Sequence, residues 1–277
     1  MRIRATVAAV SGALALSALA VPAAQAGERS DYRVSPFVAN AQQDEIQGDI
    51  QITKVVVNGG KDIVVGTTAA KTFSIAITAT DPSGIEGGDQ FLWHGTAFNE
   101  NDIDGALISE QEAANCVQAS ATTSTCTVSV TVDPQVDLYK NALAGTWKVW
   151  ASVYANDGDY VFKEIAGTAR VQRASTLTVN AAPEPVVKGK PITVTGKLAR
   201  ANWETSTYAG YTAQPVKLQF RKAGTTTYST VKTVNTDSTG NLKTTVTAAS
   251  DGYWRWSFAG TSTTPAVSAA GDYVDVR

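Results

Sequence analysis

Apolar residues recur at every second position in short runs along most of the chain, which is the spacing of half-buried β-strands. In the first half these runs cover 50–57, 72–80, 91–98, 127–132, 146–154 and 160–171. In the second half they cover 176–179, 192–198, 216–221, 228–234, 242–247, 253–258 and 273–276. Turn-forming residues separate them, as in Asn58-Gly59-Gly60. The pattern predicts an all-β protein.

The arrangement of the runs predicts two immunoglobulin-like Greek-key β-sandwiches that follow a signal peptide. Short strands with turns every 8–12 residues over about 100 residues are typical of such a sandwich. A change of composition near Arg173 divides the chain into a first domain, 49–172, and a second domain, 173–277. Residues 27–48 are polar and lack a periodic pattern, so we expect a flexible N-terminal arm there.

The first 26 residues are typical of a secretory signal peptide. Arg2 and Arg4 precede the apolar stretch 5–21, and Ala24-Gln25-Ala26 fits the small-x-small cleavage pattern. The apolar stretch is short, so a signal peptide is favoured over a membrane anchor. We therefore expect a secreted, extracellular protein that is free of the membrane once residues 1–26 are removed.

Cys116 and Cys126 are the two cysteines of the chain. In an exported protein a single pair predicts one disulfide. A redox pair or a zinc site would need Cys-x-x-Cys spacing or further ligands, and neither is present.

Charge is distributed unevenly along the sequence. Residues 72–139 contain ten Asp and Glu but no Lys or Arg. Over 27–172 there are 19 acidic and 9 basic residues, a net charge of −10, whereas 173–277 has 6 acidic and 12 basic residues, a net charge of +6. The asymmetry indicates separate roles for two domains or their mutual attraction; ordinary variation of solvated surfaces is the alternative.

The acidic stretch suggests a site for a hard cation, with calcium as the candidate cofactor. Its loop carboxylates are the candidate metal ligands: Asp81, Glu86, Asp89, Glu100, Asp102 and Asp104. The segment 100–112 matches a calcium loop of the EF-hand type only in part, because position 12 is Gln111 rather than Glu. Asp81 begins an Asp-Pro-Ser-Gly turn, so the alternative is that its carboxylate only caps its own backbone.

Aromatic residues suggest a second kind of site. Trp203, Tyr208 and Tyr211 lie in an expected loop of the basic half, where they could form a platform for extracellular carbohydrate or cell-wall polymer. Trp254 and Trp256 share one face of a strand, and because large rings usually belong to the core of a sandwich, a core position is favoured over a platform. The basic residues form no basic-aromatic stripe in the sequence, so we expect no nucleic acid partner.

Catalytic motifs are lacking in the sequence. His94 is the one histidine, and no Gly-x-Ser-x-Gly turn or phosphate-binding loop accompanies it. We therefore expect no enzyme. The prediction is a secreted, non-enzymatic protein that binds calcium through acidic loops of the first domain; the alternative is an adhesion module for carbohydrate or cell wall.

Several segments resemble a known family. The stretches 175–180, 188–197, 216–222 and 251–261 are similar to bacterial immunoglobulin-like domains. Together with the Arg-Ile-Arg start, the Cys116–Cys126 loop and Ala144-Gly145-Thr146-Trp147, they resemble two-domain secreted proteins of streptomycetes and relatives. The resemblance covers nearly the whole chain. It implies the fold and an extracellular location, and some members carry the label "calcium-binding protein", while most have no known role.

Overall fold

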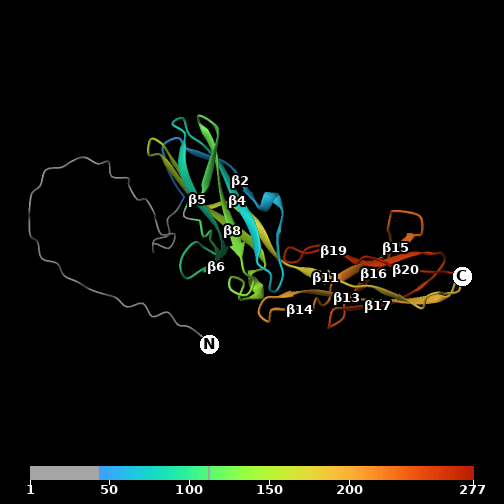
Figure 1. The fold of residues 1–277 in the computed structure, drawn as a ribbon. Coiled ribbons are helices and arrows are strands. Elements are labelled where there is room, and N and C mark those ends of the chain that lie inside the picture. Colours follow the sequence, from blue (N-terminus) through green and yellow to red (C-terminus); the bar gives the residue numbers. More distant parts are fainter. Residues whose placement is uncertain (1–43, 112) are drawn as a thin grey trace, which may run out of the picture. The chain divides into compact units, whose positions relative to one another are not determined.

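The computed structural model describes residues 44–111 and 113–277; the predicted signal peptide and residues 27–43 of the predicted arm lie outside this part. Strands make up nearly all of the regular structure (Figure 1), and the helical residues described form two short 3-10 turns, η1 (Asn58–Gly60) and η2 (Asn141–Leu143). The all-β prediction is confirmed.

The first ten strands form a sandwich of two sheets. One sheet has the order β1-β10-β9-β5-β6, with β3 added parallel to β10, and the other has the order β2-β4-β8-β7. The strands are β1 (Glu45–Gln47), β2 (Gln51–Val57), β3 (Ile63–Val65), β4 (Lys71–Thr80), β5 (Ile85–Gly95), β6 (Ile103–Leu107), β7 (Asn115–Ser120), β8 (Thr123–Val132), β9 (Gly145–Ala155) and β10 (Tyr160–Arg173). From β4 onward the chain changes sheet between β4 and β5, between β6 and β7, and between β8 and β9, as in an immunoglobulin-type Greek key.

The remaining strands form a second sandwich of the same type. Long β13 pairs with β11 and β12, and also with β14 and β17, while the other sheet has the order β16-β15-β18 followed by β19 and β20. The strands are β11 (Ser175–Leu177), β12 (Asn180–Ala182), β13 (Pro191–Asn202), β14 (Thr207–Gly210), β15 (Pro215–Lys222), β16 (Ser229–Asn235), β17 (Asn241–Thr247), β18 (Gly252–Phe258), β19 (Val267–Ser268) and β20 (Asp272–Val274).

Alternation of side chains determines which residues fill each core. In the first sandwich Trp147 and Val149 are inaccessible to solvent between the sheets. In the second, Trp254 and Trp256 of β18 point into the core, where they are 4% and 0% exposed. These two rings are therefore core residues rather than a platform, as expected for large aromatic side chains.

Some predicted boundaries were wrong. The run 91–98 belongs to β5, which begins at Ile85 and ends at Gly95. The first residues of β5 show no alternation of apolar and polar side chains, because they include two glycines. At Gly88 the neighbouring strand leaves no room for a side chain: a Cβ there would be 2.6 Å from the carbonyl oxygen of Ser152. Short strands such as β6 were not predicted, and the end of the expected arm forms β1, which pairs with β10.

Cys116 and Cys126 form the predicted disulfide. They are directly opposite each other on β7 and β8, so the bridge lies within one sheet and fastens an edge strand to its neighbour. Across the described part of the chain, none of the helices has the length and apolar character that a membrane crossing requires.

The second sandwich contributes side chains to the core of the first. Ala201 and Trp203, at and beyond the end of β13, belong to the same buried cluster as Trp147. Arg173, at the end of β10, is 8% exposed and donates from Nε to the carbonyl oxygen of Ala201 at 2.5 Å. Burial, together with the positive charge of Arg200, lowers the pKa of Arg173 to about 10, so the guanidinium stays charged at neutral pH.

Candidate functional site

Three carboxylates from distant parts of the sequence meet at one end of the first sandwich. Asp49 lies between β1 and β2, Asp81 follows β4, and Asp159 precedes β10. One carboxylate oxygen from each lies within 4.8 Å of the others, and among residues 44–111 and 113–277 this is the one such group of three His, Cys, Asp or Glu side chains. This end is opposite to Arg173, because β10 runs from Tyr160 to Arg173.

Asp81 is the buried member of the group, with 1% of its surface exposed. Its Oδ1 accepts hydrogen bonds from the backbone N–H of Ser83 at 2.7 Å and from the hydroxyl of Ser83 at 2.6 Å. The predicted turn cap is therefore present. Oδ2 is also buried, yet it has no hydrogen-bond partner in the part of the chain that the structure describes. A buried carboxylate oxygen without a donor is costly unless a cation or a proton satisfies it.

Asp159 is held against the β1–β2 connection by the backbone. Its Oδ2 accepts the N–H of Asp49 at 3.0 Å, and its own N–H donates to Oδ1 of Asp157 at 3.2 Å. Gly48 makes this approach possible: it has a φ of 81°, and a Cβ at this position would be 1.5 Å from Oδ2 of Asp159. The position requires glycine for both its conformation and its contact.

The negative charges of the group reinforce one another. Partial desolvation, followed by the charge of Asp81, raises the pKa of Asp49, and the charges of Asp159 and Asp157 act in the same direction. Two carboxylates that share a site cannot both ionise without cost unless a cation is bound between them. The arrangement is therefore suited to a hard divalent cation, which prefers oxygen ligands.

The six carboxylates proposed from the sequence do not converge on one point. Of these, Asp81 alone joins the cluster; the other five are Glu86, Asp89, Glu100, Asp102 and Asp104. Glu86 and Asp89 are exposed positions of β5, and Glu100 is an exposed position of the β5–β6 turn. The segment 100–112 contains strand β6 rather than the loop of an EF-hand.

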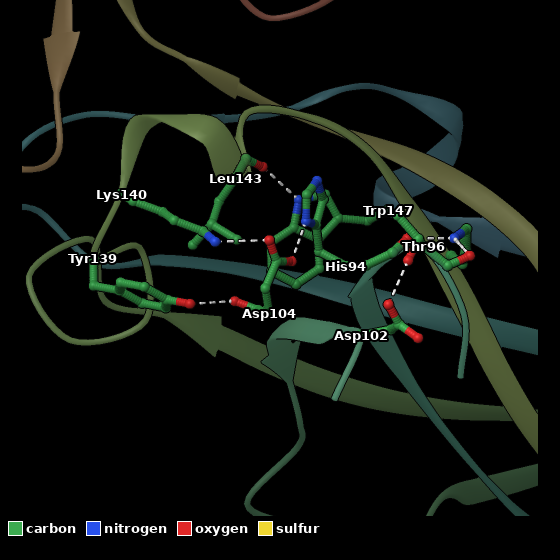
Figure 2. A network of polar contacts seen from close by, with 10 residues as sticks. His94, Thr96, Asp102, Asp104, Tyr139, Lys140, Leu143 and Trp147 are labelled. Carbon is green, nitrogen blue, oxygen red and sulfur yellow. Dashed lines mark hydrogen bonds and ion pairs between the residues drawn. The ribbon is translucent and has the colours of Figure 1, made fainter. Parts of the chain in front are cut away.

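Asp102 and Asp104 have partners within the protein (Figure 2). Asp102 accepts from Thr96 Oγ1 at 2.8 Å, as Figure 2 shows. It also accepts from Asn99 Nδ2 at 2.8 Å, and the bonds from Asn99 and Thr96 lower its pKa. Asp104 pairs with Lys140 Nζ at 2.8 Å and accepts from Nδ1 of His94. Partial burial opposes ionisation of Asp104, but the bonds from Lys140 and His94 lower its pKa overall.

This network gives His94 a structural role. Its ring lies 5.3 Å from that of Trp147, and its Nδ1–H is directed at a carboxylate that is already neutralised by Lys140. Tyr139 donates from its hydroxyl to the backbone carbonyl of Asp104 at 2.7 Å, so the segment before β9 is fixed to β6. Among the residues that the structure describes, no serine or cysteine side chain forms a hydrogen bond with His94.

The aromatic platform proposed from the sequence is not assembled. Trp203 is 3% exposed, and its Nε1 donates to the carbonyl oxygen of Gly66 at 2.9 Å. Tyr211 is half-buried, with the guanidinium of Arg200 lying 3.7 Å from its ring centroid. Tyr208, at 44% exposure, is the member of the three that is open to solvent. Trp203 is therefore a core residue, and the prediction that it forms part of a binding platform was wrong.

Asp49 and Asp159 were not among the predicted ligands because both lie outside the basic-free stretch 72–139. A different signal was available in the sequence. Each stands beside a glycine in a polar turn, as Gly48-Asp49 and Asp157-Gly158-Asp159. Such pairs mark sharp turns in which a carboxylate lies close to the backbone, but they do not indicate which turns meet.

Comparison with known proteins gives a family match to part of the chain. Residues 64–154 match DUF5707, a family of unknown function. This match covers β4 to β9 and therefore most of the first sandwich, including Asp81. It contains neither Asp49 nor Asp159. No curated protein matches the chain.

The chain also has weak similarity to several solved structures. The D00-D0 domain of intimin matches with 16% identity and a TM-score of 0.27, covering 80% of this chain and 99% of that one. Dpr2 Ig1-Ig2, solved in complex with DIP-Theta Ig1-Ig3, matches with 13% identity and a TM-score of 0.29, covering 80% and 98%. The Yersinia pseudotuberculosis adhesin InvE matches with 16% identity and a TM-score of 0.24, covering 79% and 56%. These likenesses concern the fold alone.

Proposed function

We propose that this protein is a secreted, non-enzymatic extracellular module whose first sandwich binds a divalent cation, with calcium as the preferred ion, at Asp49, Asp81 and Asp159. The observation that carries the proposal is the buried Oδ2 of Asp81, which lacks a donor and belongs to a group of three carboxylates within 4.8 Å. The disulfide supports an oxidising, extracellular compartment.

The ligand types favour calcium over softer metals. Calcium takes six to eight oxygen ligands in a flexible geometry, so carboxylates, backbone carbonyls and water together can complete its shell. Neither histidine nor a thiol belongs to the group, and transition metals usually prefer such ligands. Magnesium requires a more regular octahedron and serves as the comparison ion.

A shared proton is the competing explanation of the geometry. In that arrangement one carboxyl group of the cluster stays protonated and donates to a neighbour, which agrees with the raised pKa of Asp49. The two explanations differ in their response to added cation, because only a ligand bound by the native state raises the unfolding midpoint by mass action.

The test is calorimetric titration and thermal unfolding of the secreted protein in calcium, in magnesium and in chelator. At free calcium about 100 times Kd, we expect a stabilisation of about 2.7 kcal/mol, equivalent to several degrees in Tm for a chain of this size. Asp81→Asn retains an oxygen that can cap Ser83 but removes a charge. We therefore expect it to raise Tm in chelator and to abolish the calcium response.

Glu86→Gln is the matched control, since it removes one carboxylate of the same acidic stretch from an exposed position outside the group. It should keep the full calcium response. Absence of a calcium response in the parent protein would favour the shared proton, and an unchanged response in Asp81→Asn would locate binding elsewhere.

A further inference from the structure

The outer face of the sheet containing β15, β18 and β20 carries a row of tyrosine and arginine side chains. Strand register places Arg221 of β15 opposite Tyr253 of β18, and Tyr253 opposite Tyr273 of β20. Because Trp254 and Trp256 point into the core, Tyr253 and Arg255 point outward from the same strand. Arg221, Tyr228, Tyr253, Arg255 and Tyr273 are called the tyrosine–arginine face below.

Stacking fixes the two guanidinium groups on this face. The guanidinium carbon of Arg221 lies 4.1 Å from the ring centroid of Tyr253, and that of Arg255 lies 3.7 Å from the ring centroid of Tyr228. Arg255 also donates from Nε to Oε1 of Gln219 at 2.8 Å. Cation–π contacts of this kind hold the planar groups in place, so less side-chain entropy is lost when an anion binds them.

Neither arginine is neutralised by an acidic side chain. Within the described part of the chain, no carboxylate lies within ion-pair distance of Arg221 or Arg255. Two acidic side chains lie at the Tyr273 end: partial desolvation, followed by the charges of Asp251 and Asp275, raises the pKa of Tyr273. Asp275 pairs with Arg277 at 2.8 Å, whereas Asp251 accepts the neutral backbone N–H of Val276 at 2.8 Å, which does not cancel its charge. The two unpaired guanidinium charges of Arg221 and Arg255 exceed this single carboxylate, so the face keeps a net positive charge.

The ring contacts indicate what kind of anion the face can bind. Tyr228 contacts both guanidinium groups, with Arg255 at 3.7 Å and Arg221 at 5.3 Å from its ring centroid. Tyr253 contacts Arg221 and also Tyr273, whose ring centroid is 5.1 Å away at an interplanar angle of 58°. This arrangement leaves little parallel stacking surface for nucleobases. It offers guanidinium N–H donors for carboxylates or sulfates, together with phenol hydroxyls for sugar hydroxyls. Tyr273 is 40% exposed at the edge of the row.

We infer that the tyrosine–arginine face binds an acidic polysaccharide, with guanidinium N–H groups on its acidic substituents and tyrosines along its sugar rings. The net charge of +6 over 173–277 draws a polyanion to this half of the molecule. The inference is independent of the cation site, which lies on the first sandwich.

The experiment measures binding of the full secreted chain to polygalacturonate, with dextran as the neutral polysaccharide and a single-stranded DNA oligonucleotide as a polyanion without sugar acids. All measurements contain chelator, because calcium could otherwise bridge polygalacturonate to the acidic first sandwich. We expect binding to polygalacturonate, weak binding to the oligonucleotide and none to dextran.

Two variants test the face and one serves as control. Arg221→Gln/Arg255→Gln should weaken binding at least about tenfold, the size expected for lost charge-assisted hydrogen bonds. Tyr273→Ala changes an exposed side chain, so it tests the face even where the double variant folds poorly. We expect a several-fold loss of affinity. Lys197→Gln/Lys243→Gln removes the same charge from exposed positions of β13 and β17 on the opposite sheet and should retain binding.

Three results would overturn the inference. Equal loss in the lysine control would mean that net charge alone attracts the polymer. Unchanged affinity for polygalacturonate in both face variants would mean that the polymer does not bind to the tyrosine–arginine face. Tighter binding of the oligonucleotide than of polygalacturonate would assign the face to nucleic acid.

Discussion

The indole Nε1 of Trp203, which follows β13 in the second sandwich, donates a 2.9 Å hydrogen bond to the carbonyl oxygen of Gly66 in the first. Its ring belongs to the buried cluster that contains Trp147. The first sandwich therefore depends on a side chain from the second for part of its core. This residue carries stability, whereas its sequence context had suggested binding.

Trp203→Ala should lower the free energy of unfolding by about 3–5 kcal/mol, the usual cost of deleting a buried large aromatic ring. The loss combines an emptied volume with an unpaired carbonyl at Gly66. Denaturant unfolding followed by tryptophan fluorescence measures it. Val231→Ala, at a position that is 49% exposed, should change stability by less than about 0.5 kcal/mol. Similar values for the two variants would contradict a core role for Trp203.

Gly48→Ala should impair the proposed cation site without removing a ligand. The new methyl group would occupy the place of the Asp159 carboxylate, since the Cβ would be 1.5 Å from Oδ2. We expect calcium affinity to fall at least about tenfold in calorimetric titration, or 1.4 kcal/mol. Gly59→Ala is the matched control: its φ is 61°, and a Cβ there meets nothing within 4 Å. It should lose about 1 kcal/mol of stability and keep its affinity.

Calcium should slow amide hydrogen exchange in β1. The strand pairs with β10 and is followed at once by Gly48 and Asp49, so a cation shared by Asp49 and Asp159 would fasten its end to the β9–β10 turn. Edge strands with few partners open locally at low cost. Mass spectrometry of exchanged peptides should show increased protection at 45–47 with calcium and no change at β20. Equal protection in calcium and in chelator would mean that cation binding does not stabilise β1.

Asp237 should titrate far below an ordinary aspartate. Hydrogen bonds from the backbone N–H groups of Thr239 and Asn241 lower its pKa to about 2. The folded pKa lies below the unfolded value of about 3.9, so the capped turn contributes stability above about pH 4 and loses it as the pH falls towards 2. Carboxyl chemical shifts measured by NMR against pH should give the low midpoint. A midpoint near 4 would mean that the cap is absent in solution.

The sequence predicted the β-strands better than the site. A strand is indicated by the alternation of neighbouring residues, whereas the site depends on contacts between residues that are distant in the chain. Alternation in 146–154 reports the two faces of one strand, so β9 was found within one residue at each end. The disulfide was found because the only two cysteines must pair with each other. Short strands such as β6, whose five residues include Gly105 and do not alternate strictly between apolar and polar, gave no such signal and depend on pairing with β5.

The aromatic residues show that alternation along a strand does not predict every buried side chain. Alternation places Trp254 and Trp256 on one face of β18, and the usual burial of large rings in a sandwich favoured a core position. Trp203 follows a strand and has no such neighbours. Its burial results from contact with Gly66 and the first core, and no local pattern encodes that contact.

By itself the sequence determined the all-β class, most strand positions and the pairing of Cys116 with Cys126, because these depend on local alternation, turn formers and a single possible partner. Tertiary structure decided that Asp49, Asp81 and Asp159 meet and that Arg221, Tyr253 and Tyr273 align. Both outcomes follow from strand register and from the Greek-key connections, which bring residues distant in the chain to one end or one row. Carboxylates cluster where loops converge, and their density along the sequence does not reveal that point.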